Sequence, residues 1–254
     1  MEWPTKSVGH RSNHLTDTEA DMTSRRDFLK GLAVGSVAVG GWSAATRLAK
    51  PSSDGTVLWG FNAPVLDQGN VGSCTGNAVT QFLNTDFAIG RSKRKSYLTE
   101  DDAVKIYTAA TVYDDPVFPG NYPTVDTGSN GDFACVGAVQ LGYLSGFGNI
   151  CPDLASIVAA LGKQPLIVGS QWTYSMFSPD YRGFVEATGD LVGGHEYLML
   201  GYDAPGRYFT FLNSWSEKWG LKGRFKVKAD DYVKLLDGEP TAVVAPDVKC
   251  CTAS

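Results

Sequence analysis

The sequence predicts an α+β protein with two lobes, because helix-like and strand-like patterns occupy different parts of the chain. Between residues 74 and 161, apolar residues recur at the spacing of amphipathic helices. After Gly162 the patterned segments become short and rich in β-branched and aromatic residues. The length of 254 residues and the 43% hydrophobic content are enough to bury a full core. This segregation favours a helical lobe and a sheet lobe with a cleft between them.

The N-terminal region has the pattern of a targeting signal. The stretch Ser24-Arg25-Arg26-Asp27-Phe28-Leu29-Lys30 precedes a weakly apolar, glycine-rich run from Gly31 to Gly41, and together they resemble a twin-arginine export signal. Met22 stands just before the arginine pair, so we interpret the first 21 residues as an over-long start. The apolar run is too short and glycine-rich for a stable membrane span. We therefore expect the twin-arginine export machinery as a partner and a periplasmic or secreted location, outside a bacterial or archaeal cytoplasm.

The boundary between the signal and the folded domain is expected near residue 45. Ser43-Ala44-Ala45 offers the small residues that precede a cleavage site, although the match is loose. The prediction is a signal region at 1–45 and one folded domain at 46–254. Membrane retention by an uncleaved signal stays open as an alternative.

Four helices are expected in the first half of the folded domain. The first begins at Cys74, because Ala78, Val79 and Phe82 follow it at helical spacing. The second opens with the capping box Thr99-Glu100-Asp101-Asp102. The predicted helices run from Cys74 to Leu83, from Thr99 to about Val112, from Phe133 to Leu144 and from Pro152 to Leu161.

Four strands are expected in the second half. The turn sequence Ala204-Pro205-Gly206-Arg207 separates the second strand from the third. The predicted strands are Pro165 to Trp172, His195 to Tyr202, Tyr208 to Trp215 and Arg224 to Val227.

The charge of the chain argues against nucleic acid as a partner. The formal net charge is -5, and no run of Lys or Arg forms a basic face. The expected partner is instead a protein or peptide, for the chemical reasons that follow.

Three short blocks contain the side chains that covalent acyl transfer requires. Gln68 precedes Cys74 by six positions, His195 follows two glycines, and Asn213 begins Asn213-Ser214-Trp215. These residues supply a donor for an oxyanion, a thiol nucleophile, an imidazole base and an amide that orients the base. The combination predicts a thiol hydrolase.

His195 is the only candidate for the base. The chain has three histidines, and two of them, His10 and His14, lie in the region expected to be removed or never made. A cysteine needs an imidazole or an equivalent group to become a thiolate near neutral pH. A helix N-terminus at Cys74 is expected to lower the thiol pKa together with a nearby imidazolium. With one histidine left, a histidine-based metal site is excluded, and we expect no metal and no organic cofactor.

The chain resembles the papain-like cysteine peptidases, specifically their compact bacterial relatives, over most of residues 60 to 236. The six-position spacing of Gln68 and Cys74 agrees with the family pattern. Asn213-Ser214-Trp215-Ser216-Glu217-Lys218-Trp219-Gly220 is similar to the family's Asn-Ser-Trp-Gly-x-x-Trp-Gly, and Gly223-Arg224-Phe225 is similar to the glycine-aromatic close after it. The resemblance implies a papain-like two-lobed fold, with the nucleophile on the helical lobe and the base on a β-barrel-like lobe.

The resemblance also implies the role of each residue. Cys74 would attack a peptide carbonyl and form an acyl-thioester. His195 would form an ion pair with it, protonate the leaving amine and then activate water. Asn213 would orient the imidazole, and Trp215 would shield that hydrogen bond from water. Gln68 would join the Cys74 backbone N–H in the oxyanion hole.

Some positions depart from the family pattern. Thr75 stands where an aromatic residue usually follows the nucleophile, Val71 replaces a structural cysteine, Ser216 replaces a glycine, and Glu196 replaces a small apolar residue after the histidine. The disulfide usual on the helical lobe therefore cannot form. By the same resemblance, Gly169 and Gly193 lie near the wall that accepts the substrate side chain second from the cut, which predicts an open pocket.

Four cysteines remain besides Cys74. Cys135, Cys151, Cys250 and Cys251 allow three connectivities in an oxidising compartment, and the sequence does not choose among them. Adjacent cysteines seldom bond to each other without strain. Cys135 lies in an apolar helical run and fits a buried thiol equally well.

The predicted function is that of an exported cysteine endopeptidase. A catalytically inactive peptide-binding protein of the same fold stays an alternative, as does an acyltransferase or amidase that uses the same Cys-His pair. The lead-in before Gln68 leaves little room for an inhibitory pro-segment, so narrow specificity, late acid activation or a separate protein inhibitor is expected to restrain the enzyme.

Overall fold

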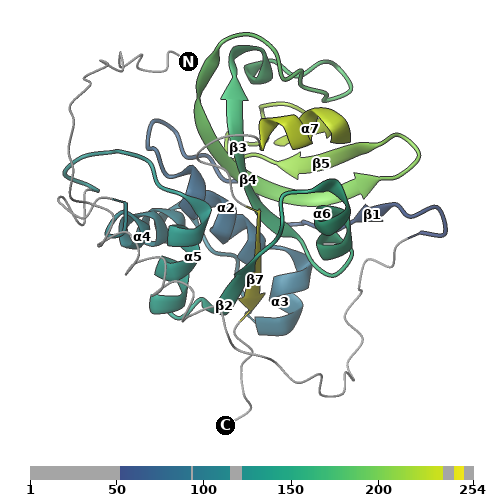
Figure 1. Cartoon of the computed structure of the whole chain (residues 1–254). Coiled ribbons are helices and arrows are strands. Elements are labelled where there is room, and N and C mark those ends of the chain that lie inside the picture. Colours follow the sequence, from purple (N-terminus) through teal and green to yellow (C-terminus); the bar gives the residue numbers. More distant parts are fainter. Residues whose placement is uncertain (1–51, 93, 115–121, 237–242, 249–254) are drawn as a thin grey trace, which may run out of the picture. The chain divides into compact units, whose positions relative to one another are not determined.

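The computed structural model describes residues 52–92, 94–114, 122–236 and 243–248, all within one compact unit (Figure 1). The predicted export signal, its boundary at residue 45, Cys250 and Cys251 lie outside the described residues.

The described part of the chain is α+β, as predicted. Its helices are α2 (Cys74–Leu83), α3 (Asp86–Ser92), α4 (Glu100–Ala110), α5 (Gly131–Gln140), α6 (Leu154–Leu161) and α7 (Ala229–Leu235), with a short 3-10 helix, η1, at Tyr174–Phe177. Its strands are β1 (Val57–Leu58), β2 (Leu144–Asn149), β3 (Leu166–Thr173), β4 (Leu191–Asp203), β5 (Tyr208–Leu212), β6 (Arg224–Lys228) and β7 (Val243–Val248).

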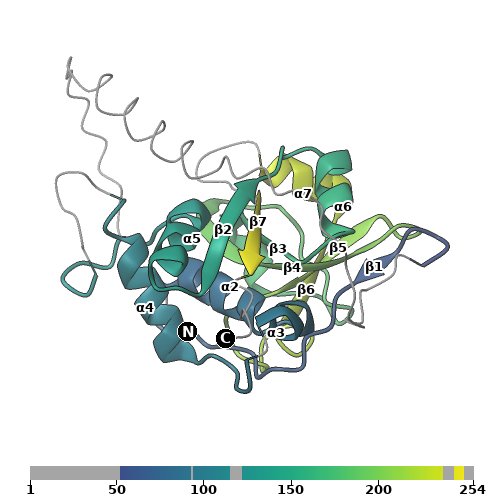
Figure 2. The same ribbon diagram turned by 90° about the horizontal axis from the view of Figure 1, so that it is seen from below.

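Three helices form a group against one part of the sheet. Helix α2 packs against α4 and α5, and it also contacts β3 and β4. Both ribbon views show α2, α4 and α5 side by side (Figures 1 and 2). Every residue of α2 after Cys74 is buried, so this helix forms the centre of the core. The nucleophile candidate therefore stands at the first residue of the most enclosed helix.

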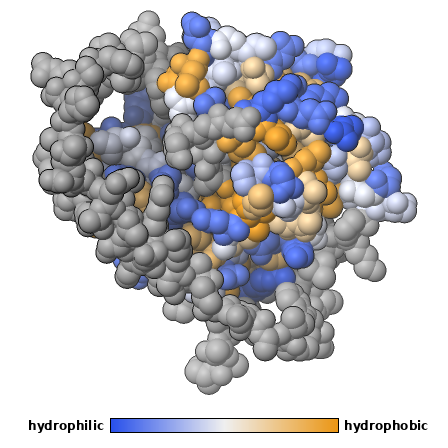
Figure 3. Space-filling model, in the orientation of Figure 1, coloured by the Kyte–Doolittle hydropathy of each residue, from blue (hydrophilic) through white to orange (hydrophobic). Residues whose placement is uncertain are grey.

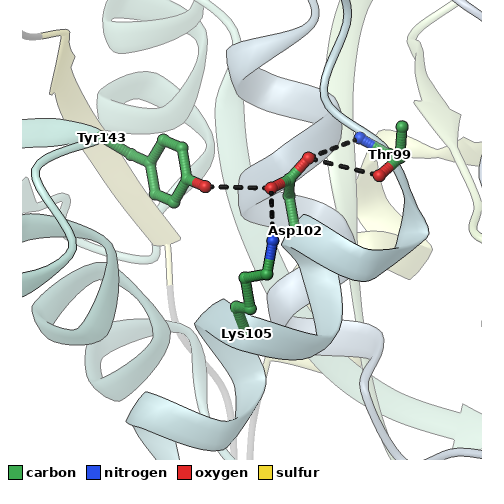
Figure 4. Close-up of polar contacts among 4 residues, drawn as sticks. All are labelled: Thr99, Asp102, Lys105 and Tyr143. Carbon is green, nitrogen blue, oxygen red and sulfur yellow. Dashed lines mark hydrogen bonds and ion pairs between the residues drawn. The ribbon is translucent and has the colours of Figure 1, made fainter.

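The capping box predicted for α4 is present. The Asp102 carboxylate accepts a 3.0 Å hydrogen bond from the Thr99 backbone N–H and another of 3.0 Å from the Tyr143 hydroxyl. Lys105 lies 3.3 Å from the same carboxylate (Figure 4). The contact with Tyr143 joins the start of α4 to the segment between α5 and β2.

Helix α5 ends earlier than predicted. It stops at Gln140, because Gly142 adopts a left-handed φ of 78° and the Tyr143 N–H bonds back to the Ala138 carbonyl at 2.9 Å. This is the hydrogen-bond pattern with which glycine commonly ends helices. Leu144, predicted as the last helical residue, instead begins β2.

The sheet is antiparallel, with the strand order β2-β7-β3-β4-β5-β6, and β1 pairs with β4. All four predicted strands are present, although β5 is shorter than predicted. β4 starts at Leu191, so His195 lies inside the strand and not at its start. The register pairs His195 with Ser170 and Glu196 with Gly169. The strict order of helices before strands was wrong, because β2 precedes α6.

Helix α6 packs against β4 and α7, and it keeps several residues half-buried. Figure 3 shows hydrophobic surface near the centre of the view, where Figure 1 places α6, surrounded by mostly hydrophilic surface. None of the helices in the described ranges is long and apolar enough to cross a membrane.

Candidate active site

The structure places Cys74 at the N-terminus of α2, where its sulfur meets backbone amides. Its own N–H and that of Thr75 donate toward the sulfur. A third N–H donates from Glu196 on β4, the residue directly after His195. The predicted nucleophile on the helical side and the predicted base on the sheet are therefore brought together across the boundary of the two layers.

The side chain of His195 is hydrogen-bonded to that of Asn213. The Nε2 atom of His195 lies 2.7 Å from Oδ1 of Asn213. The same Oδ1 accepts a 2.8 Å hydrogen bond from the Ser214 backbone N–H, which fixes the orientation of the amide. Because a carbonyl oxygen can only accept, Nε2 of the neutral imidazole carries the proton. The other ring nitrogen, Nδ1, is then a hydrogen-bond acceptor.

Aromatic rings enclose the imidazole. Trp215 stacks on it with ring centroids 4.9 Å apart and an interplanar angle of 22°. Trp172 meets it edge-on at 4.9 Å and 76°. The imidazole and Asn213 are both buried. The shielding role that the sequence predicts for Trp215 fits this stacked position.

Burial decides the protonation of His195. Loss of hydration lowers the pKa of the imidazole to about 4, and the hydrogen bond with Asn213 only partly opposes this effect. The uncharged imidazole is therefore the favoured form at neutral pH.

Gln68 is clamped to the segment that contains Asn213. Its backbone N–H donates to the Ser214 carbonyl at 2.9 Å, and its side-chain Oε1 accepts from Oγ of Ser214 at 2.6 Å. Its side-chain Nε2 donates to the Val71 carbonyl at 3.0 Å. An amide nitrogen has two N–H groups, so this contact leaves a second donor on Gln68.

The expected lowering of the Cys74 pKa is wrong for this environment. Burial first, and the Glu196 carboxylate second, raise the pKa of the thiol to about 12. The three backbone N–H groups lower the pKa, but their effect is smaller. The sequence indicated that a helix begins at Cys74. It did not indicate that the Glu196 carboxyl group on β4 lies near the thiol.

Further residues support the nucleophile loop, and sequence reasoning missed them. Asp126 accepts hydrogen bonds from the Gly72 N–H at 2.7 Å and from the Tyr107 hydroxyl at 2.5 Å. Glu100 accepts from Asn77 at 2.8 Å and from the Asp67 N–H at 3.2 Å. No local sequence signal marks these contacts, because the partners lie 19 to 54 positions apart.

Other predicted features have simple structural roles. Asn130 caps α5 by accepting a 3.0 Å hydrogen bond from the Phe133 N–H. Cys135 is a buried free thiol, and Cys151 is an exposed one. Within the described ranges, no three His, Cys, Asp or Glu side chains are grouped so that they could hold a metal ion.

Comparisons with known proteins give a consistent result. Residues 121–240 match the family model described as papain family cysteine protease, a range that contains His195 and Asn213. Xylellain, a cysteine protease from Xylella fastidiosa, is 17% identical, with a TM-score of 0.53 over 85% of this chain and 95% of that one.

Two eukaryotic structures have similar folds. The Carica candamarcensis cysteine protease CMS1MS2, solved in complex with E-64, is 15% identical, with a TM-score of 0.56 over 76% of this chain and 98% of that one. Digestive procathepsin L 3 of the Tenebrio molitor larval midgut is 20% identical, with a TM-score of 0.51 over 88% and 79% of the two chains. Residues 121–240 therefore match the papain family of cysteine proteases, and the described part of the chain has the papain-like fold.

Proposed function

We propose that the chain is an endopeptidase that cleaves peptide bonds through an acyl-thioester on Cys74. One observation carries this proposal: His195 is held by Asn213 through Nε2, and the next peptide N–H of the same strand donates toward the Cys74 sulfur. The unprotonated Nδ1 of His195 and the thiol of Cys74 are therefore close in space. General-base activation of a thiol requires such a pair.

The first half-reaction transfers the acyl group to sulfur. His195 Nδ1 takes the thiol proton as the Cys74 sulfur attacks the substrate carbonyl carbon, and the carbonyl oxygen becomes an oxyanion. The imidazolium then gives this proton to the amide nitrogen, the C–N bond breaks, and the amine leaves. The acyl group remains as a thioester on Cys74.

The second half-reaction restores the enzyme. His195 Nδ1 takes a proton from water, whose oxygen attacks the thioester carbon. The C–S bond then breaks, and the proton returns to the sulfur as the carboxylic product leaves. In both half-reactions the same atom, Nδ1 of His195, takes up the proton and later releases it.

The oxyanion is assigned to two donors. They are the second N–H of Gln68 and the backbone N–H of Cys74, which would turn from the sulfur to the oxyanion as the charge moves there. Removing one such donor typically costs about 10²–10³ in kcat.

The isolated pKa shifts favour a neutral resting pair. Burial raises the pKa of Cys74 and lowers that of His195, so both groups are uncharged when considered one at a time. Proton transfer between them creates two opposite charges side by side, which attract strongly in a dry site. The proton therefore moves as the attack takes place, with the helix N-terminus favouring the thiolate.

Labelling with a peptidyl epoxide or vinyl sulfone, followed by mass spectrometry, tests this function on purified protein. We expect an adduct on Cys74 that is lost in His195→Ala. The exposed Cys151 is an internal control, since a small alkylating agent reaches it without any catalytic machinery. Alkylation of Cys151 without any directed adduct on Cys74 of folded, reduced protein would overturn the proposal.

A peptide-binding protein without catalysis is the second candidate. It is favoured by the buried Glu196 carboxyl group, which in its ionised form acts against formation of a thiolate on Cys74. Retention of peptides by the unmodified protein without cleavage, together with failure of the directed probe, would support it. A transferase or amidase would label at Cys74 but would release products with an added amine acceptor or with ammonia, so product analysis separates these reactions.

We also propose that the enzyme is exported in folded form by the twin-arginine route. The support is the Arg25-Arg26 motif with the following glycine-rich run. Changing both arginines to lysine should leave the protein in the cytoplasm, whereas Arg47→Lys, a matched change outside the motif, should not. Export of the double variant at the normal level would refute this route.

A further inference from the structure

Next to the catalytic pair lies a buried carboxyl group that has no partner of opposite charge among the described residues. The Glu196 side chain is only 5% exposed, and its Oε1 has no hydrogen-bond partner among the described residues. Oε1 lies against the first residue of α5, since a Cβ added at Gly131 would meet it at 2.2 Å. An uncompensated buried carboxylate is costly, so its presence here calls for a ligand or a proton.

A second carboxyl group, that of Asp132, shares the same surroundings. Oδ2 of Asp132 accepts a 3.1 Å hydrogen bond from Asn149, while the buried Oδ1 has no partner among the described residues. The described ion pairs involve other carboxylates, at Asp102, Asp180, Asp230 and Asp231. Glu196 and Asp132 thus form an acidic pair that the described part of the chain does not neutralise.

Among the described residues, the groups that interact with this pair are other acids, thiols and hydroxyls. Burial, and next the Asp132 carboxylate, raise the pKa of Glu196 well above its ordinary range. Burial also raises the pKa of Asp132. The thiols of Cys74 and Cys135 and the hydroxyls of Tyr197 and Tyr232 are close enough for Glu196 to raise their pKa values. A proton therefore compensates Glu196 as long as no cation is bound.

The backbone of Glu196 lies beside the nucleophile. The Glu196 N–H donates toward the Cys74 sulfur, the atom that holds the acyl group. An extended peptide advances about 3.3 Å per residue, so a side chain within two residues of the cut can reach the Glu196 carboxylate. Across the sheet, Glu196 pairs with Gly169, which has no side chain to fill the space.

We propose that Glu196, together with Asp132, binds a basic side chain of the substrate within two residues of the scissile bond. The enzyme is then selective for peptides with arginine or lysine at that position. The inference rests on the proposed function, which places the scissile bond of a peptide at Cys74. It adds the class of substrate, namely peptides with a basic residue near that bond. On binding, the cation replaces the proton of Glu196, which leaves to solvent. Arginine is the better ligand, because its planar fork of N–H groups can satisfy two carboxylate oxygens at once.

Binding to the Cys74→Ala protein tests the inference without requiring catalysis. Matched peptide series carry arginine, lysine, norleucine or glutamate at each position around the cut, and calorimetry gives their affinities. We expect one position within two residues of the cut where arginine binds at least about 30-fold more tightly than norleucine, and where glutamate binds most weakly. Equal or better binding of norleucine at every position would overturn the inference.

Three substitutions identify the carboxyl group responsible. Glu196→Gln keeps the shape and should bring the arginine-to-norleucine ratio close to one. Asp132→Asn should reduce this ratio partly, and it keeps the test valid if Glu196→Gln does not fold. Glu186→Gln makes the same chemical change at an exposed carboxylate and should keep the full ratio. A full ratio in folded Glu196→Gln would exclude Glu196 as the basic-residue site.

Failure of the inference differs from failure of the proposed function. An active enzyme with a labelled Cys74 and no basic preference refutes only the inference. A basic preference in binding, without any directed adduct on Cys74, refutes the peptidase mechanism and leaves the binding site in place.

Discussion

Oγ of Ser214 donates a 2.6 Å hydrogen bond to Oε1 of Gln68, although the two residues lie 146 positions apart in the chain. This bond turns the Gln68 amide so that its nitrogen faces the nucleophile loop, where Val71 accepts one N–H. Ser214 therefore orients Gln68, the proposed oxyanion donor, and the neighbouring Asn213 orients His195, the proposed base.

The first prediction concerns this amide. Gln68→Ala removes the side-chain donor and should lower kcat about 10²- to 10³-fold, with little change in KM, because the oxyanion forms only after attack. Ser214→Ala removes only the orienting bond and should give a smaller loss of kcat. Steady-state kinetics with a fluorogenic peptide measures both. A loss that appears only in KM would contradict the assigned role of Gln68.

The second prediction concerns the ring that covers the base. Trp215→Ala admits water to His195 and should raise the imidazole pKa from about 4 toward its ordinary value of 6.5, since burial causes the lowering. NMR titration of His195 in the Cys74→Ala background measures this shift. Trp219→Ala, which removes a ring that touches Trp215, should shift the pKa less. Identical titrations in all three proteins would show that the indole does not exclude water.

The third prediction concerns stability and the buried acid. The Glu196 carboxyl has an ordinary pKa of 4.5 in the unfolded chain and a raised pKa in the folded protein. Unfolding then releases a proton, so the free energy of unfolding falls as pH rises above 4.5. Glu196→Gln removes this loss and should stabilise the protein at pH 8 and not at pH 4. Urea unfolding at both pH values checks this, and an equal effect at both would contradict it.

The fourth prediction concerns the loop before the nucleophile. Asp126→Ala removes the acceptor shared by the Gly72 N–H and the Tyr107 hydroxyl, and should cost about 1–3 kcal/mol of stability. The loop that leads to Cys74 loses its anchor, so directed labelling of the thiol should also slow. Asp126→Asn keeps one acceptor and should lie between the two proteins. Unchanged thermal unfolding in Asp126→Ala would show that the loop is held by other contacts.

The fifth prediction concerns the approach of two helices. A Cβ at Gly76 would lie 2.1 Å from the Ala103 carbonyl oxygen of α4, so Gly76→Ala must push α2 and α4 apart. We expect a loss of about 1–3 kcal/mol or more, although alanine favours helices over glycine. Gly148→Ala is the control, because nothing lies within 4 Å of its added Cβ. Equal unfolding temperatures in the two variants would contradict this packing.

Local patterns in the sequence predicted the features that depend on neighbouring residues. The capping box at Thr99 and the helix that starts at Cys74 were recognised in this way. The pairing of His195 with Asn213, which lie 18 positions apart, was expected from the chemistry of two separate motifs and from the family resemblance. The end of α5 was missed, because the apolar pattern continues past Gly142 while the backbone turns there.

Contacts between distant segments could not be predicted in the same way. β2 pairs with β7 through partners such as Leu144 and Val248, and no local pattern records such a pairing. Glu196 was seen only as a departure from a family pattern, since Gly131 and Asp132 reach it from another part of the chain. The direction of the Cys74 pKa shift was wrong for the same reason.

The clamp between Gln68 and Ser214 also has a consequence for synthesis. During translation Cys74 is synthesised long before His195 and Asn213. A nascent chain that ends before residue 213 therefore contains Cys74 but no oriented imidazole. Contacts between segments so far apart give high contact order, and they form late in folding. Labelling of Cys74 that depends on His195 therefore reports completion of the whole domain, and an unfinished chain on the ribosome has no oriented base with which to cleave peptides.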